Sequence, residues 1–187
     1  MTKARQSAHS VLDRTLRVDD IPAAGELVAI DVPARSLHAL AEAMGVERVL
    51  KAHAELNLAR AAGGAVEVRG RASAVVEQIC VVTLEPFEST ISEPIDIRFA
   101  PQAEVEAAEA RLRGRPAEDE NDAPDLPEPI ENGILPLGAL VQEFLALAVD
   151  PYPRKPGAVF EGGKDAADER VSPFAALAKL RKEPDGD

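Results

Sequence analysis

The 187-residue sequence contains no tryptophan, one tyrosine, five phenylalanines and a single cysteine. Aromatic residues make up 3% of the chain and hydrophobic residues 45%, so the core must consist of Val, Leu, Ile and Ala. The lone Cys80 excludes an intramolecular disulfide and fits a reducing compartment. The length is that of one domain of ordinary size, with room for a tail.

Long apolar runs are also missing. The N-terminus has no apolar segment of the kind that a signal peptide needs. No stretch approaches the ~18 uninterrupted apolar residues of a membrane-spanning helix. The sequence therefore predicts a cytoplasmic protein that does not contact a membrane.

Positive charge is in deficit, because 21 Lys and Arg residues face 33 Asp and Glu residues, for a formal net charge of −12. A protein that grips nucleic acid through its phosphates needs cations to displace condensed counterions. The overall field of this chain repels RNA and DNA. We therefore expect a basic protein partner, or RNA that is contacted inside an assembly, and no DNA partner.

The first half of the chain predicts a mobile polar arm over residues 1–10, ahead of one domain over residues 11–153. Two short strands are expected at 11–18 and 27–30. A helix follows, with Ser36 as its N-cap and Gly45 at its left-handed end.

The periodicity then changes from 3.6 to 2, which indicates long strands. Alternating apolar residues over 50–58 and 66–74 predict two strands that are joined by a hairpin at residues 63–64, both glycine. The alternation slips over residues 74–79, which predicts a β-bulge or a change of face. A further strand is expected over residues 91–99, with Ile and Phe on one side.

Residues 101–131 hold ten carboxylates against three arginines, and several prolines. The part that ends at Arg113 can form a short helix. Residues 114–129 carry too little apolar surface to offset their ordering entropy, so we expect an acidic, partly disordered loop there. Its carboxylates lack the ligand spacing and the turn glycine of an EF-hand.

Apolar residues recur at helical spacing from Leu137 to Ala148 and stop at Asp150-Pro151. Residues 154–187 are expected to form an extended tail that holds a short amphipathic helix at 172–182. Its cations crowd its C-terminal end, where the helix dipole favours them. Long antiparallel strands with few helices between them predict an α+β fold, a curved sheet with two or three helices packed on it.

No constellation of residues predicts catalysis or a cofactor. The metal-ligand candidates (Cys80, His9, His38 and His53) do not form the close pairs of a zinc site, so we predict no metal and no cofactor. Nothing in the sequence sets a base beside Cys80, and the chain has no P-loop, GxGxxG or GxSxG motif. We predict a non-enzymatic binding protein. An RNA-processing hydrolase or nuclease and a chaperone-like module that sequesters a basic protein are the alternatives.

Residues 80–87, Cys-Val-Val-Thr-Leu-Glu-Pro-Phe, resemble the Cys-x-x-Cys-Leu-Glu-Pro-Phe signature of the YceD-like family of large-subunit ribosomal RNA accumulation proteins. Thr83 stands in the place of the second cysteine. A Leu-rich block at 137–143, the segment at 151–153 and an ending at 173–180 similar to that of alphaproteobacterial relatives extend the resemblance. It implies a non-enzymatic role in ribosome biogenesis, in the accumulation or maturation of large-subunit ribosomal RNA, through a large-subunit ribosomal protein or pre-ribosomal RNA. The metal binding suggested for the family rests on cysteine pairs that this chain lacks.

Two clusters of residues are candidates for the partner surface. In the first, we expect Pro86 to close a strand, Phe87 to plug the end of the sheet, and Glu85 to face solvent or cap an amide. A plain turn is the structural alternative. The second cluster is the basic end of the predicted last helix, for which dipole complementation is the alternative. The candidates are Glu85, Pro86, Phe87, Phe174, Lys179, Arg181 and Lys182.

Overall fold

The computed structural model of this chain describes residues 11–113 and 125–159. The predicted arm at 1–10 and the predicted helix at 172–182 lie outside the described residues. Four of the candidate residues therefore have no described position: Phe174, Lys179, Arg181 and Lys182.

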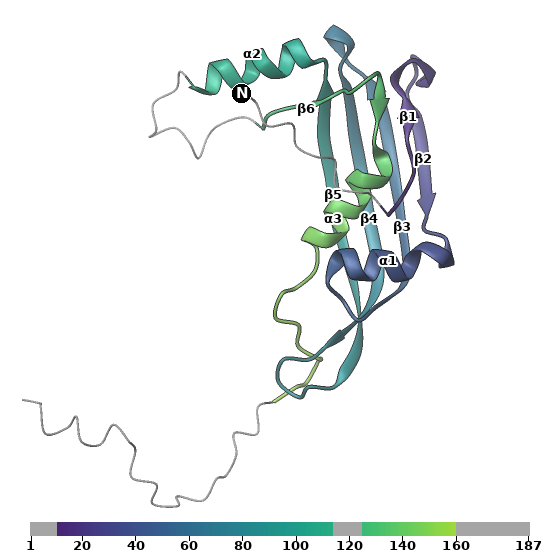
Figure 1. Cartoon of the computed structure of the whole chain (residues 1–187), viewed down its shortest axis with the longest axis vertical. Helices are drawn as coiled ribbons and strands as arrows, with labels where there is room; N and C mark the ends of the chain where they lie inside the picture. The colour runs from purple at the N-terminus through teal and green to yellow at the C-terminus, as the bar shows by residue number, and fades with distance from the viewer. Residues whose placement is uncertain (1–10, 114–124, 160–187) are drawn as a thin grey trace, which may run out of the picture.

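A five-stranded, mostly antiparallel sheet in the order β2-β3-β4-β5-β6 forms the body of the molecule, so the predicted α+β fold is confirmed (Figure 1). Its strands are β2 (Glu26–Asp31), β3 (Arg48–Arg60), β4 (Val66–Ile79), β5 (Pro86–Ala100) and β6 (Glu128–Pro129). A second, two-stranded sheet pairs β1 (Leu16–Arg17) with β7 (Ile134–Leu135). The helices are α1 (Ala34–Met44), α2 (Gln102–Arg113) and α3 (Leu137–Leu147). No helix among the described residues is long and apolar enough to cross a membrane.

Helices α1 and α3 lie on one face of the sheet (Figure 1). The apolar side chains that alternate along the strands form one buried cluster with those of these helices. Among the described residues, the buried hydrophobic side chains are aliphatic apart from Phe99, Met44 and Cys80, and Gln78 is the one buried polar side chain. The other face of β3, β4 and β5 carries charged and small polar side chains, as expected for an antiparallel sheet with one solvated side.

Two N-terminal predictions need correction. The first strand covers only Leu16–Arg17 instead of residues 11–18, because only these two residues pair with β7 and a 3-10 turn at Val18–Asp20 follows. Ser36 does not cap α1. Pro33 holds the N-cap position, and the Ser36 N–H donates to the Pro33 carbonyl. The predicted left-handed end is confirmed, since Gly45 has φ 69°.

The predicted hairpin between β3 and β4 is confirmed, with Gly63 and Gly64 both at positive φ in its 3-10 turn Ala62–Gly64. The bulge, however, lies on β3, where the register shifts between Val49 and Lys51. Strand β4 alternates without a break as far as Gln78. The apparent slip in the sequence arose because a polar glutamine occupies a buried position.

The acidic stretch is more ordered than predicted at its C-terminal end. Helix α2 confirms the short helix that ends at Arg113, and Arg98 on β5 contacts Glu104 at its start, at 2.8 Å. Glu128–Pro129 form β6 and pair in parallel with the end of β5, so the loop prediction is wrong there. A strand at the edge of a sheet tolerates a proline. Residues 114–124 of the predicted loop are outside the described ranges.

Candidate functional site at the tip of the long hairpin

Residues 80–85 form the turn between β4 and β5, and we call this turn the hairpin tip. The prediction that Pro86 closes a strand is wrong, because Pro86 opens β5 and pairs with Ile79. Proline is tolerated at the first position of a strand, where its missing N–H breaks no ladder bond. Phe87 is the next residue of β5 and is half-buried opposite Gln78, while Glu85 is exposed.

Two backbone hydrogen bonds define the tip. The Cys80 N–H donates to the Glu85 carbonyl, and the Leu84 N–H donates to the Cys80 carbonyl, both at 2.9 Å. Leu84 has a left-handed backbone with φ 58°, which costs a residue with a Cβ about 1 kcal/mol. Its side chain is 76% exposed. The tip therefore holds a leucine in solvent on a strained backbone, which needs an explanation beyond packing.

The chain after α3, residues 149–159, runs beside the hairpin tip, and we call it the proline segment. The Val81 N–H donates to the Pro153 carbonyl at 2.9 Å. At the same junction, the Lys155 ammonium lies 2.9 Å from a carboxylate oxygen of Glu85. The two blocks of the sequence resemblance, far apart along the chain, thus form one surface.

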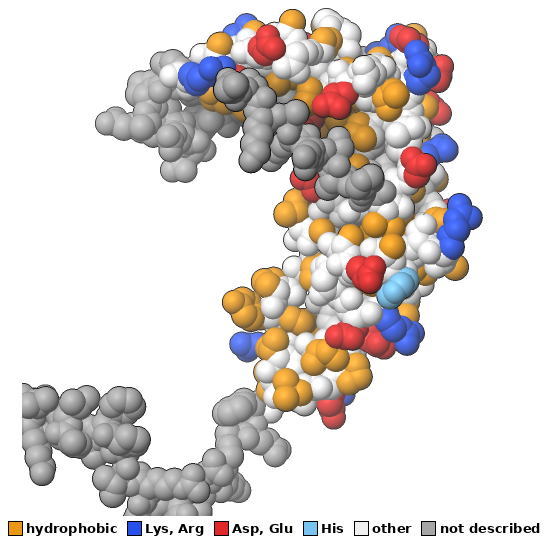
Figure 2. All heavy atoms as spheres, in the orientation of Figure 1, with side chains coloured by type: hydrophobic (Ala, Val, Ile, Leu, Met, Phe, Trp, Pro, Cys, Tyr) orange, Lys and Arg blue, Asp and Glu red, His pale blue; other side chains and the backbone are white. Residues whose placement is uncertain are grey.

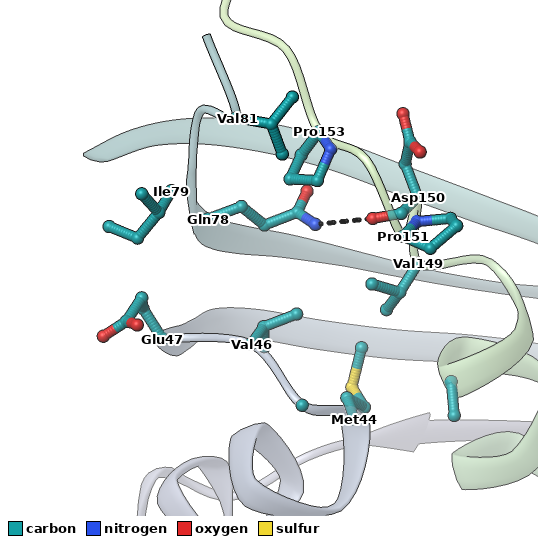
Figure 3. A pocket seen from close by; sticks show the side chains of 12 residues that line it. Met44, Val46, Glu47, Gln78, Ile79, Val81, Val149, Asp150, Pro151 and Pro153 are labelled. Atoms are coloured by element: carbon teal, nitrogen blue, oxygen red, sulfur yellow. Dashed lines mark hydrogen bonds between the residues drawn. The ribbon is translucent and has the colours of Figure 1, made fainter. Parts of the chain in front are cut away.

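Gln78 fastens the proline segment from the buried side. Its Nε2 donates to the Asp150 carbonyl at 3.3 Å (Figure 3). Its Oε1 accepts a hydrogen bond from the Ser89 hydroxyl at 2.9 Å. A buried amide needs such partners on both ends. Sequence reasoning missed Gln78, although a polar residue at an apolar position of a clear alternation was the available signal.

Cys80 is fully buried, as expected for a small apolar residue, yet its sulfur has several hydrogen-bond donors around it. The sulfur accepts hydrogen bonds from three backbone N–H groups, those of Val82 at 3.4 Å, Thr83 at 3.5 Å and Lys155 at 3.3 Å. A hydrogen bond from the Thr83 side chain, together with these N–H groups, lowers the pKa of the thiol to about 7 against the opposing effect of burial. Thr83, which replaces the second cysteine, therefore contacts the first.

The described residues do not gather ligands for a metal ion. Within residues 11–113 and 125–159, no group of three His, Cys, Asp or Glu side chains is arranged to hold one. His53 instead lies 2.9 Å from Asp31 on the solvated face of the sheet, and His38 contacts Glu42 along α1. Neither histidine is among the hydrogen-bond partners found for Cys80.

A pocket of about 500 Å³ opens beside the tip, between the turn after α1, the end of β4, and the end of α3 with the proline segment (Figure 3). Eight of its twelve lining residues have apolar side chains, with Met44, Val46, Ile79, Val81, Val149 and Pro153 among them, and polar atoms contribute about half of the exposed lining. The charged residues that line it are Glu47 and Asp150, and no lysine or arginine is among the lining residues. No salt bridge joins either carboxylate to a cation within the described ranges.

Exposed apolar side chains surround this pocket. Figure 2 shows hydrophobic side chains gathered at the lower end of the described surface, where Figure 1 places the end of the long hairpin. Val81, Leu84 and Tyr152 are among the exposed large hydrophobic residues there, together with Leu147 at the end of α3. Exposed apolar side chains gathered next to a pocket are typical of an interaction site. We call the pocket with Val81, Leu84 and Tyr152 the tip surface.

Comparison with known proteins now identifies the family. A family model described as "Large ribosomal RNA subunit accumulation protein YceD" matches residues 68–181, well over half of the chain. The chain belongs to the YceD family. No curated protein and no solved structure matches it. The family match begins in β4 and includes the hairpin tip, α3 and the proline segment, so most of the tip surface lies inside the part that defines the family.

Proposed function

We propose that the chain acts in ribosome biogenesis as a non-catalytic factor that binds a basic large-subunit ribosomal protein at the tip surface. The family's description implies a role in the accumulation of large-subunit ribosomal RNA. Capture of a ribosomal protein before its assembly would support that role without any chemical step. The observation that carries the proposal is the apolar tip surface, whose pocket is lined by carboxylates and by no cation.

The charges of the tip surface favour a protein over an RNA. A phosphate backbone needs lysines and arginines on its partner, whereas Glu47 and Asp150 would repel it. A cationic peptide segment with apolar side chains fits both features, because its apolar groups enter the pocket while its cations face the two carboxylates. Electrostatic complementarity of this kind speeds association and rejects wrong partners.

The exposed apolar residues of the tip surface are numerous enough to bind a partner with micromolar affinity. Fully burying a Leu or Val side chain contributes roughly 1.5–3 kcal/mol. Val81, Leu84 and Tyr152, covered together with the pocket walls, would reach the range of micromolar binding after the costs of association. The exposed Leu84 then has a reason to be there, since its strained position holds an apolar side chain ready for a partner.

The experiment is a binding assay with the purified full-length chain and ribosomal proteins that have been extracted from large subunits. We expect capture of a basic protein that survives ribonuclease, and co-sedimentation of the chain with large-subunit precursors in cells. Leu84→Asn should weaken binding at least tenfold, because Asn removes the apolar contact but adopts a left-handed backbone readily. Leu27→Asn is the matched control, since Leu27 is 72% exposed but lies on β2, away from the tip.

Three results would overturn the proposal. Capture that disappears with ribonuclease would assign pre-ribosomal RNA as the direct partner. Chelator-sensitive trimming of precursor RNA by the purified chain would establish the rival hydrolase. Absence from large-subunit precursors, with normal ribosomal RNA after deletion, would remove the role in biogenesis altogether.

The acidic stretch is a separate candidate contact for the same basic partner. Glu128 and Pro129 belong to the sheet, so the deletion that tests it is limited to residues 114–124. Weaker capture after this deletion would make the stretch part of a sequestering, chaperone-like surface. Unchanged affinity would make it a linker.

A further inference from the structure

We infer that the pocket beside the hairpin tip is a docking site for the chain's own C-terminal segment, residues 172–182. The docking does not depend on the partner proposed above. If that partner also binds there, the segment and the partner compete for the pocket.

The pocket supplies the first observation. It has a volume of about 500 Å³ and is lined mainly by residues with apolar side chains, and its only charged lining residues among those described are Glu47 and Asp150. The carboxylate of Asp150 accepts the Tyr152 N–H at 2.8 Å, which fixes one acidic position at the rim. Glu47 provides a second on the opposite wall, in the turn after α1. An occupant must therefore present an apolar stripe and a positive charge.

The sequence of the C-terminal segment has these two features. Phe174, Leu177 and Ala178 are spaced three and four residues apart, the spacing that puts side chains on one side of a helix. Lys179, Arg181 and Lys182 follow directly. Apolar anchors at this spacing are how an amphipathic segment enters a groove.

The length of the chain allows the contact. Pro153 lines the pocket, and the described chain ends six residues later at Val159. About a dozen residues then lead to the segment, and an extended chain of that length spans up to about 40 Å. A short linker of this kind gives an effective concentration in the millimolar range, so even weak intrinsic affinity suffices for docking.

The family match adds an independent reason. It extends from β4 through residue 181, and so includes the segment together with the hairpin tip and the proline segment. The segment is thus part of the unit that defines the family. The family pattern therefore covers both the pocket wall formed by β4 and the proline segment and the segment that we infer to bind it.

Disulfide trapping tests the contact in the full-length chain. In a Cys80→Ser background, the pair Ala146→Cys and Leu177→Cys joins the pocket wall to the apolar stripe. The matched control joins Leu177→Cys to Ser92→Cys, which is exposed on the solvated face of β5. We expect the pocket pair to form an intramolecular disulfide at least tenfold faster than the control pair under the same mild oxidant.

Charge reversal sharpens the test. Glu47→Lys should slow trapping of the pocket pair several-fold, and Lys182→Glu added to it should restore the rate. Equal trapping of the pocket and control pairs would overturn the inference. Disulfides between two chains would assign the pocket to the segment of a second copy, which also overturns it.

Hydrogen exchange provides a readout that needs no cysteine. We expect the amides of residues 44–47 and 78–81 to exchange faster in Leu177→Asp than in the unmodified chain. Ala176→Asp, one position off the apolar stripe, is the control and should leave them unchanged. Equal exchange in all three proteins would contradict docking. If Leu177→Asp abolishes docking and the chain still captures its partner, the docking and the proposed function are shown to be independent of each other.

Discussion

The Nε2 of Gln78 donates a hydrogen bond to the backbone carbonyl of Asp150, 72 residues later in the sequence. This bond joins the end of β4 to the chain after α3, and the two meet at the pocket wall. The relationship explains how a proline-rich segment without regular structure becomes part of a defined surface: a buried amide on the sheet holds its backbone.

Gln78→Glu should destabilise the chain, because a carboxylate oxygen would replace the donor that faces the Asp150 carbonyl. We expect a loss of about 1–3 kcal/mol in the free energy of unfolding at neutral pH, measured by urea denaturation. The effect should shrink as the pH falls, because a protonated carboxyl can donate again and its pKa is raised in the folded state. Equal destabilisation at pH 5 and pH 8 would contradict this role for Gln78.

The thiol of Cys80 should titrate with a midpoint near 7 in the folded chain, since its pKa is lowered to about 7 by the Thr83 side chain and the surrounding N–H groups. Thiolate absorbance in the ultraviolet measures this directly, because the chain has one cysteine. Thr83→Val should move the midpoint up toward the ordinary value of a thiol, while Thr83→Ser keeps the hydroxyl and should keep the midpoint.

The same shift makes stability depend on pH with a definite sign. A folded pKa below the unfolded one means that the thiolate stabilises the fold at pH values above the unfolded pKa. This contribution decreases as the pH falls and is lost below about 7. As the pH rises from 7 to 9, the free energy of unfolding of the unmodified chain should therefore increase relative to that of Thr83→Val. A constant difference between the two proteins across that range would refute the assignment.

Much of the fold follows from local patterns. The alternation along β3 and β4, the glycines at 63–64 and the left-handed Gly45 all act within a few residues, so the sequence alone predicts them. The bulge was placed on the wrong strand, because pairing decides which strand carries the extra residue. Pro86 looked like the end of a strand for a similar reason: only its partner Ile79 shows that it begins one.

The site was harder to predict than the fold. The motif at 80–87 marks the hairpin tip, but the pocket also needs the turn at 44–47 and the chain at 146–153. No local pattern indicates that these three segments meet. The hydrogen bonds of Cys80 show the same limit, since one of its donors is the N–H of Lys155, 75 residues away.

Gly138 lies where the start of α3 packs against the backbone of residues 12–14. A Cβ at this position would collide with the backbone carbonyl of Leu12, and the Gly138 N–H donates to the Arg14 carbonyl at 2.7 Å. Gly138→Ala should therefore cost at least about 2 kcal/mol, because backbone cannot move aside as a side chain can. The control is Glu143→Ala on the exposed side of α3, for which thermal denaturation should show little change.

Arg60, at the end of β3, holds the turn that precedes β2. Its Nε donates to the Ile21 carbonyl at 2.8 Å, and its Nη2 donates to the carbonyls of Val18 at 2.8 Å and Asp19 at 2.9 Å. A planar guanidinium can satisfy three carbonyls at once, whereas a lysine ammonium cannot reproduce this fork. The Ile21 side chain is buried in the core, so the hydrogen bonds of Arg60 stabilise the backbone next to a core residue.

Arg60→Lys should accordingly cost about 1–3 kcal/mol in the free energy of unfolding, although the charge is kept. Amide exchange should speed up around residues 16–21 and stay the same at the hairpin tip, because Arg60 lies at the opposite end of β3 from the turn after α1. Arg71→Lys, which loses only one hydrogen bond to the Ser92 hydroxyl on the solvated face, is the control and should leave both readouts unchanged. Equal losses in the two variants would mean that charge or general packing, and not the three-carbonyl fork, fixes the N-terminal turn.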